Sequence, residues 1–357
     1  MKILLAARGV DLAAWQAALA QHLPQAQSRI WLAGDTAPAD YVLYWKEQIE
    51  ALQARAGVKA IFNLGAGVDA LLKAVRANPG SLAEQVPVVR LEDAGMARQM
   101  VEYSVYCALR YLRRFHHYEA LARQGMWRPF ETPAPADFVV GVLGAGQLGQ
   151  PVAMALQALG FAVRIYSRSP KTIPGITSFT GTDALAAFAT GANLVINLLP
   201  NTPETENILN AAFFSHMQHG SYLVNLARGA HVQDDDLLAA LAAGQLERAA
   251  LDVFREEPLP ATHPFWHHPQ IEITPHISAR TLIAESAEQI AAKIVSCEQG
   301  GVLRGIDLQR GYYAAALPFR PARIQFRLRY SAACSSVYSA SGPCRISAPG
   351  KASGSFR

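Results

Sequence analysis

Three glycines, Gly144, Gly146 and Gly149, form a GxGxxG pattern directly after an apolar run, FVVGVL, and directly before a helical run, PVAMALQALG. In that setting the first glycine permits a tight turn, the second lets a pyrophosphate approach the backbone, and the third lets helix and strand pack closely. Phosphate oxygens would then lie at the helix N-terminus, where free N–H groups favour anions. The pattern predicts a dinucleotide site that includes Gln147 and Leu148, although alone it can mark only a tight turn.

The turn after the next strand, FAVRIYS, indicates which dinucleotide is bound. In an NAD site this strand would end in an Asp or Glu that holds the ribose 2′-hydroxyl. Here the chain continues as Ser167, Arg168, Ser169, Pro170 and Lys171, so no carboxylate repels a 2′-phosphate and the guanidinium can donate paired hydrogen bonds to one. We therefore expect NADPH (NADP) at this turn, with NADH less favoured. A solvated basic turn without a ligand is the alternative.

Alternating strands and helices would position these residues. Apolar runs of strand length are followed by helical patterns in two series, which predicts parallel sheets with helices on both faces. The expected strands are residues 1–7, 39–45, 58–64 and 86–91 in the first series and residues 138–143, 161–167, 192–200, 220–229 and 248–254 in the second. Since single cores stop growing near roughly 250–300 residues, a chain of 357 residues predicts two domains. We expect an α/β fold of two doubly wound parallel-sheet domains.

Two further helices are expected outside these series. Residues 95–124 contain no proline and only one early glycine, and they predict one long helix that could cross between the domains. Residues 125–137 hold three prolines and predict a linker. Residues 281–300 predict a last amphipathic helix that could return to the first domain.

Charge and cysteine content exclude several classes of function. The net charge is +4, but the segment from Arg320 to Arg357 adds seven positive charges and no acid, so the remaining chain carries −3. No nucleic-acid-binding face is expected on the folded part, and residues 312–357 are expected to be an irregular tail. The four cysteines lack metal-type spacing, and the N-terminus is too short an apolar run for a signal peptide or a membrane span. A cytoplasmic protein without membrane contact is expected.

Three histidines, His263, His267 and His268, lie close together in the sequence and raise the question of a metal site. No cysteine or paired carboxylate nearby completes a coordination shell, and the segment is predicted to be a connecting loop. We therefore expect no metal.

Six stretches of the sequence resemble one known family: NLGAGVD, DAGMARQMVEY, YSRSPK, LVNLARGAHV, ALDVFREEPLP and EITPHISART. The chain resembles the D-isomer-specific 2-hydroxyacid dehydrogenases from Met1 to about Gly311, and the glyoxylate/hydroxypyruvate reductase A branch in particular. The resemblance implies a homodimer, a flavodoxin-like substrate domain and a Rossmann nucleotide-binding domain. It also implies the boundaries 1–98 with 281–311 for the substrate domain and 99–280 for the nucleotide domain.

The resemblance implies a catalytic set of Arg228, Glu257 and His276. Reduction of a 2-oxo acid needs a hydride at C2, a proton for the carbonyl oxygen and cationic support for the negative charge. By the resemblance Arg228 binds the substrate, His276 donates the proton, and Glu257 favours the charged imidazole and fixes its orientation. Taken singly, they would be a surface arginine, a loop acid and a core histidine.

Other roles are also implied by the resemblance. Asp252 would hold the nicotinamide carboxamide, and Leu199 and Pro200 would lie along the cofactor; a turn or capping aspartate and a plain strand end are the alternatives.

The substrate carboxylate would bind backbone N–H groups at Ala66 and Gly67, in a turn that could otherwise be structural. Trp45 would form a pocket wall, although an aromatic residue at a strand end is often part of the core.

These features together predict NADPH-dependent reduction of a small 2-oxo acid such as glyoxylate or hydroxypyruvate. Two alternatives stay open: an NAD-dependent D-2-hydroxyacid dehydrogenase that acts on a larger acid, and a non-catalytic nucleotide-sensing or corepressor module.

Overall fold

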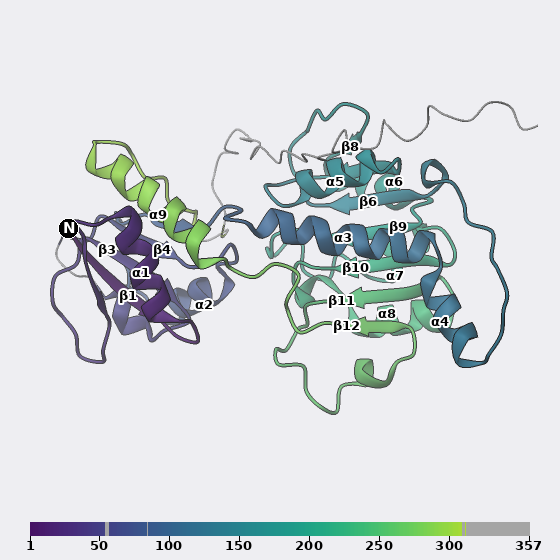
Figure 1. Ribbon diagram of the computed structural model, residues 1–357, viewed down its shortest axis with the longest axis horizontal. Coiled ribbons are helices and arrows are strands. Elements are labelled where there is room, and N and C mark those ends of the chain that lie inside the picture. Colours follow the sequence, from purple (N-terminus) through teal and green to yellow (C-terminus); the bar gives the residue numbers. More distant parts are fainter. Residues whose placement is uncertain (54–56, 84, 309–310, 312–357) are drawn as a thin grey trace, which may run out of the picture. The chain divides into compact units, whose positions relative to one another are not determined.

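The computed structural model describes residues 1–53, 57–83, 85–308 and 311, so the predicted tail at 312–357 lies outside the described residues. Two β-sheets form its framework, and every pair of strands within them is parallel (Figure 1). The predicted α/β fold of two parallel-sheet domains is therefore confirmed. Within the described part of the chain, no helix has the length and apolar character to cross a membrane.

The first sheet has five strands in the order β2-β1-β3-β4-β5. The strands are β1 (Lys2–Ala7), β2 (Gln27–Ile30), β3 (Tyr41–Trp45), β4 (Ala60–Asn63) and β5 (Val88–Arg90). The helices beside them are α1 (Leu12–His22) and α2 (Asp69–Ala77), with a short 3₁₀ turn, η1 (Ile49–Leu52). Residues 3–7 of β1 are all buried, as expected for a parallel strand covered on both faces. The order 2-1-3-4-5 is that of flavodoxin-like sheets.

The second sheet has seven strands in the order β12-β11-β10-β9-β6-β7-β8. They are β6 (Val139–Leu143), β7 (Ala162–Tyr166), β8 (Thr177–Phe179), β9 (Leu194–Asn197), β10 (Ser221–Asn225), β11 (Leu246–Leu251) and β12 (Ile271–Ile273). The chain builds outward from β6 to β8 and then returns to place β9 against the other edge of β6. Ligands of such sheets bind where the strand order reverses, at the carboxyl ends of the strands. The glycine turn follows β6, at that point.

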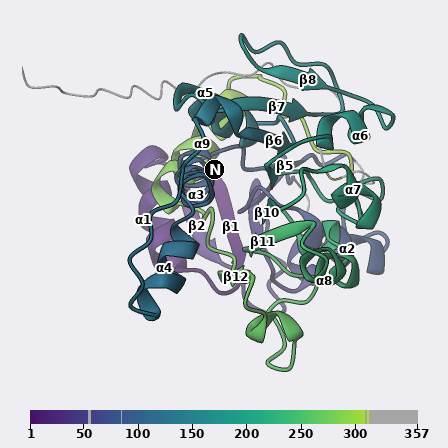
Figure 2. The same cartoon turned by 90° about the vertical axis from the view of Figure 1, so that its right-hand side faces the viewer.

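The α-helices that connect the strands of the second sheet are labelled in Figure 2, and short 3₁₀ turns lie beside them in the chain. They are α5 (Gly149–Ala158), α6 (Ala184–Ala189), α7 (Ala211–His216), α8 (Asp234–Ala242), η2 (Pro135–Asp137), η3 (Gly229–His231) and η4 (Pro264–His267).

The prediction of one long helix over residues 95–124 is wrong. The chain forms α3 (Met96–Leu112) and a separate α4 (Phe115–Arg123), because Arg114 adopts a left-handed conformation with φ of 54°. Neither proline nor glycine marks this break. The first turn of α4 instead places the buried His116 against Glu247 of β11, a tertiary contact that sequence periodicity does not report.

The last helix, α9 (Ile283–Glu298), packs on α1, far from it in sequence. Its buried residues Ala287, Ile290 and Ile294 belong to the same apolar core as Ile3 and Leu5 of β1. The core of the first sheet therefore contains both ends of the described chain, which supports the predicted return of this helix. The exact domain boundaries stay a prediction.

Candidate active site

The glycine turn between β6 and α5 has the shape that a pyrophosphate site needs. Gly144 has φ of 98°, and a Cβ there would lie 2.6 Å from the carbonyl oxygen of Leu198. A Cβ at Gly149 would lie 1.8 Å from the Gly144 oxygen, whereas one at Gly146 would meet no atom within 4 Å. Two of the glycines thus allow the chain to fold tightly on itself, and the third borders open space. Gln147 and Leu148 are half-buried beside it.

A basic turn follows β7, next to the glycine turn in the sheet. Ser167 is buried, and its hydroxyl donates to the backbone oxygen of Ser169 at 2.7 Å. The backbone N–H of Lys171 donates to the Ser178 hydroxyl at 3.3 Å. Arg168 and Ser169 are exposed at the corner of this turn. Ser167 therefore shapes the turn, and Arg168 is exposed in the turn that neighbours the glycine motif in the sheet.

His276 and Glu257 lie together in the loops that follow β12 and β11. The His276 Nδ1 atom is 2.7 Å from Oε2 of Glu257, and the other carboxylate oxygen accepts the Phe254 N–H at 3.0 Å. Burial raises the pKa of Glu257, but the hydrogen bonds from His276 and from the Phe254 N–H outweigh it and leave that pKa below its usual range. Glu257 is therefore an ionised, two-point anchor for the imidazole. His276 itself has φ of 54°, a strained conformation for a non-glycine residue.

Asp252 holds the turn that carries this strained histidine. Its side chain is fully buried; Oδ1 accepts from the Thr274 hydroxyl at 2.6 Å and the Ile277 N–H at 2.8 Å, and Oδ2 accepts from the Ser278 N–H at 2.8 Å. The backbone N–H of His276 donates to the Asp252 carbonyl at 2.9 Å. These contacts are those of a turn aspartate, the alternative that the sequence left open. A cofactor contact by Asp252 stays a prediction.

The turn after β4 forms the other side of the site. The buried Asn63 amide donates to the carbonyl oxygens of Gly65 and Gly67 at 2.8 and 2.9 Å and so folds the turn. The Trp45 ring covers Gly65 so closely that a Cβ there would lie 2.4 Å from it. Trp45, Ala66 and Gly67 are therefore neighbours, as their predicted roles require. Asn63 was missed, although a polar residue at the end of an apolar strand is a signal for such a role.

Arg228 reaches this same turn. A Cβ on Gly67 would lie 1.6 Å from Nη2 of Arg228, while Nε donates to Oδ2 of Asp69 at 2.8 Å and Nη1 donates to the Ala227 carbonyl at 2.6 Å. Burial raises the pKa of Asp69, but the charge and hydrogen bond of Arg228 outweigh it, so the net pKa is lowered. Asp69, the first residue of α2, was not predicted as a site residue, because an acidic residue in the first turn of a helix is common without any functional role.

A buried polar network links the loops after β9 and β10. The Asn197 amide donates to Oδ1 of Asn225 at 3.0 Å and lies 2.8 Å from Nδ1 of His231, and all three side chains are fully buried. Asn197 also accepts the Leu199 N–H at 3.2 Å, and Asn225 donates to the Arg228 carbonyl at 2.9 Å. Burial lowers the pKa of His231 to about 4, so the ring is neutral. The network thus fixes the loop of the buried Leu199 and exposed Pro200 relative to the loop that carries Arg228.

Comparisons with known proteins identify the family of this chain. The sequence profile described as D-isomer specific 2-hydroxyacid dehydrogenase, NAD binding domain, matches residues 105–278. The chain is 54% identical over 299 residues to glyoxylate/hydroxypyruvate reductase A of Serratia proteamaculans (strain 568), a match that covers 84% of this chain and 96% of the relative. This chain belongs to the D-isomer specific 2-hydroxyacid dehydrogenase family. The resemblance read from the sequence is confirmed, and the protein is an NAD(P)-dependent oxidoreductase.

Solved structures of other family members superpose over most of the chain. One is the D-isomer specific 2-hydroxyacid dehydrogenase of Xanthobacter autotrophicus Py2 in complex with NADPH and MES, with 36% identity, a TM-score of 0.81 and coverage of 87% of this chain and 99% of that one. Another is the NADPH-dependent glyoxylate/hydroxypyruvate reductase of Sinorhizobium meliloti in complex with NADP and sulfate, with 32% identity, a TM-score of 0.80 and the same coverage. Both family members share this fold, and their crystal structures contain NADPH or NADP.

Proposed function

We propose that this dehydrogenase reduces short 2-oxo acids, with glyoxylate and hydroxypyruvate as the expected substrates, by hydride transfer from NADPH. The observation that carries the proposal is the 2.7 Å pairing of His276 with an ionised Glu257. An imidazole whose charged form is stabilised by a carboxylate can donate the proton that carbonyl reduction requires. A non-catalytic nucleotide sensor has no need of such a pair, so this alternative is disfavoured.

The cofactor proposal rests on the two turns at the carboxyl ends of β6 and β7. The open space at Gly146 would admit the pyrophosphate to the N-terminal amides of α5. Arg168, with Ser167, Ser169 and Lys171 around it, would bind the 2′-phosphate, and the family members with bound NADP or NADPH support this choice. When bound, the nicotinamide supplies the hydride, and Leu199, Pro200 and Asp252 would lie beside it.

The substrate would be held by opposite sides of the site. Backbone amides at Ala66 and Gly67 and the guanidinium of Arg228 would bind the carboxylate and the carbonyl oxygen, with Trp45 as a wall. The Nδ1 atom of His276 is engaged by Glu257, so Nε2 is the ring nitrogen that would pass a proton to the carbonyl oxygen. Arg228 then stabilises the negative charge that develops there.

The experiment is a steady-state panel of glyoxylate, hydroxypyruvate and larger 2-oxo acids with NADPH and with NADH. We expect the highest kcat/KM for a short acid with NADPH. A preference for NADH and a larger acid would establish the first alternative, and no oxidation of either cofactor with any of these acids would contradict the proposal. The variant His276→Asn should lose kcat by roughly 10²–10⁴-fold with NADPH binding intact. The exposed His267→Asn is the matched control, and turnover of His276→Asn near that of the control would refute the proton-donor role.

We also propose that the protein forms a homodimer, as the family resemblance implies, and that it is located in the cytoplasm. Size-exclusion chromatography with light scattering would measure the oligomeric state directly.

A further inference from the structure

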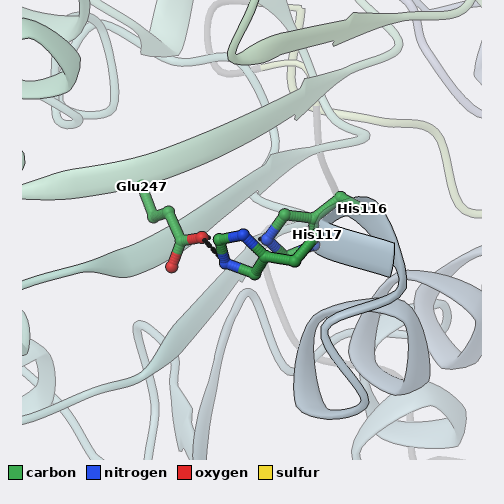
Figure 3. Close-up of side chains that lie close together, drawn as sticks. All are labelled: His116, His117 and Glu247. Atoms are coloured by element: carbon green, nitrogen blue, oxygen red, sulfur yellow. Dashed lines mark hydrogen bonds and ion pairs between the residues drawn. The ribbon is translucent and has the colours of Figure 1, made fainter. Parts of the chain in front are cut away.

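A second group of ionisable side chains lies away from the residues of the proposed active site. His116 and His117 from the first turn of α4 meet Glu247 of β11, and Figure 3 shows both imidazoles directed at its carboxylate. Nε2 of His116 lies 2.9 Å and Nε2 of His117 2.6 Å from the same oxygen, Oε1. We call this set the His116–His117–Glu247 cluster. Two ring nitrogens that converge on one oxygen are an unusual arrangement for a simple surface ion pair.

We propose that the His116–His117–Glu247 cluster binds a divalent transition-metal ion, and that Zn²⁺ fits it best. Its ligand atoms, two imidazole nitrogens and one carboxylate oxygen, all lie within 4.8 Å of one another. In a tetrahedral zinc site with bonds of about 2.0–2.1 Å, neighbouring ligand atoms are roughly 3.3 Å apart. The observed separations from Oε1, 2.9 Å for His116 and 2.6 Å for His117, are shorter than this, so both imidazoles would move outward slightly to admit the ion, His117 the more of the two. Its side chain is 42% exposed, which leaves it free to move and gives water access to a fourth position.

The other two ligands are oriented by their surroundings. The second oxygen of Glu247, Oε2, accepts the Tyr222 hydroxyl at 2.7 Å, the type of outer hydrogen bond that orients metal-binding carboxylates. The His116 ring is packed edge-to-face against Tyr111 and Tyr222. Burial raises the pKa of Glu247, but the hydrogen bonds from His116 and Tyr222 and the charges of the histidines bring it to about 2. The carboxylate is therefore ionised and available as a ligand at neutral pH.

The surroundings of the His116 Nδ1 atom set the strength of the site. Nδ1 of His116 is buried and, among the described residues, has no hydrogen-bond partner. With Nε2 bound to a metal ion, the neutral imidazole carries its proton on Nδ1, which lacks the acceptor that usually supports a ligating histidine, and such a loss weakens affinity by roughly 10–100-fold. We expect micromolar rather than nanomolar binding.

The bound ion would join α4 to β11 of the second sheet. His117 also packs against Phe130, whose N–H donates to the Tyr118 hydroxyl at 2.8 Å, so the segment after α4 is tied to the same point. Occupancy of the cluster would therefore stabilise α4 and this segment together. The His263, His267 and His268 group, the one metal candidate that the sequence suggested, does not converge in the described structure.

The test is a Zn²⁺ titration of the full-length, metal-free protein in competition with a chromophoric chelator. We expect one equivalent with micromolar Kd, a rise in Tm on saturation, and at least a 10-fold weaker Kd in His117→Ala. The exposed His267→Ala is the matched control, and His276→Asn should keep the equivalent because its ring belongs to the other site. Absence of the one-equivalent site, or an unchanged Kd in His117→Ala, would show that the cluster is only a hydrogen-bonded anchor for α4.

Cobalt spectroscopy gives a second readout of the ligands. With Co²⁺ in place of Zn²⁺, we expect the visible bands of a four-coordinate nitrogen and oxygen site that disappear in His117→Ala. A near-ultraviolet thiolate band would instead assign the ion to the cysteines and overturn the proposal.

Discussion

The position of the Arg228 guanidinium can be tested by adding one methyl group at Gly67. A Cβ at this position would lie 1.6 Å from Nη2 of Arg228, whereas ordinary contacts begin near 3.4 Å. The guanidinium must therefore move by almost 2 Å in Gly67→Ala. Because Nη2 ends a flexible side chain, the fold should survive this change. Misplacement by 1 Å can cost about 10²-fold in rate, so we expect kcat/KM for glyoxylate to fall by roughly 10²–10³-fold, or about 3–4 kcal/mol of transition-state stabilisation.

The assay is steady-state NADPH oxidation with glyoxylate, together with the Kd of NADPH and the Tm of each variant. Gly146→Ala is the matched control, because its added methyl group enters the open space assigned to the pyrophosphate. We expect the Kd of NADPH in Gly67→Ala to stay within about twofold of the parent value while kcat/KM falls. In Gly146→Ala we expect NADPH binding to weaken at least 10-fold. A Gly67→Ala variant with kcat/KM within threefold of the parent would refute the inferred position of Arg228.

Three further predictions follow from the same contacts. Arg168→Asp should change the NADPH to NADH preference by at least 10²-fold toward NADH in steady-state kinetics, and an unchanged ratio would exclude this residue from 2′-phosphate binding. Asp252→Asn should lower kcat about 10-fold through the His276 turn with the NADPH Kd unchanged; a weakened Kd with normal kcat would instead support the carboxamide role. His231 has its pKa lowered to about 4, so the unfolded chain binds its proton first and stability should fall by up to about 3 kcal/mol as pH decreases from 6.5 to 4. Urea unfolding across this range should show that loss, and a similar loss in His231→Gln would assign it to other groups.

Those parts of the fold and site that are encoded locally could be predicted from the sequence. The glycine turn is such a part, because Gly144 and Gly149 meet steric needs set by the turn itself and by the end of the adjoining strand, while Gly146 borders open space. The strand order reversal that places this turn at the ligand-binding edge also follows from alternating strands and helices. The convergence of Glu257 and His276 was expected only because the family resemblance linked two loops 19 residues apart.

Features that depend on distant contacts were missed. Asp69 and Arg228 are separated by 159 residues, and nothing near either one indicates their ion pair. Asn197 and Asn225 close two neighbouring apolar strands, but their shared hydrogen bond appears only once β9 and β10 are paired. The break between α3 and α4 lacks a glycine or proline, because Arg114 takes the left-handed conformation to satisfy packing rather than local preference.

The shared core of β1 and α9 has a consequence for biosynthesis. The strands of the seven-stranded sheet lie between residues 139 and 273, so the ribosome has delivered all of them before the residues of α9 that complete the other core are made. The part of the protein that is translated first therefore finishes folding last. Until Ile294 has left the exit tunnel, the apolar surface around Ile3 and Leu5 lacks its cover, and it is this end of the nascent chain that would need chaperone protection.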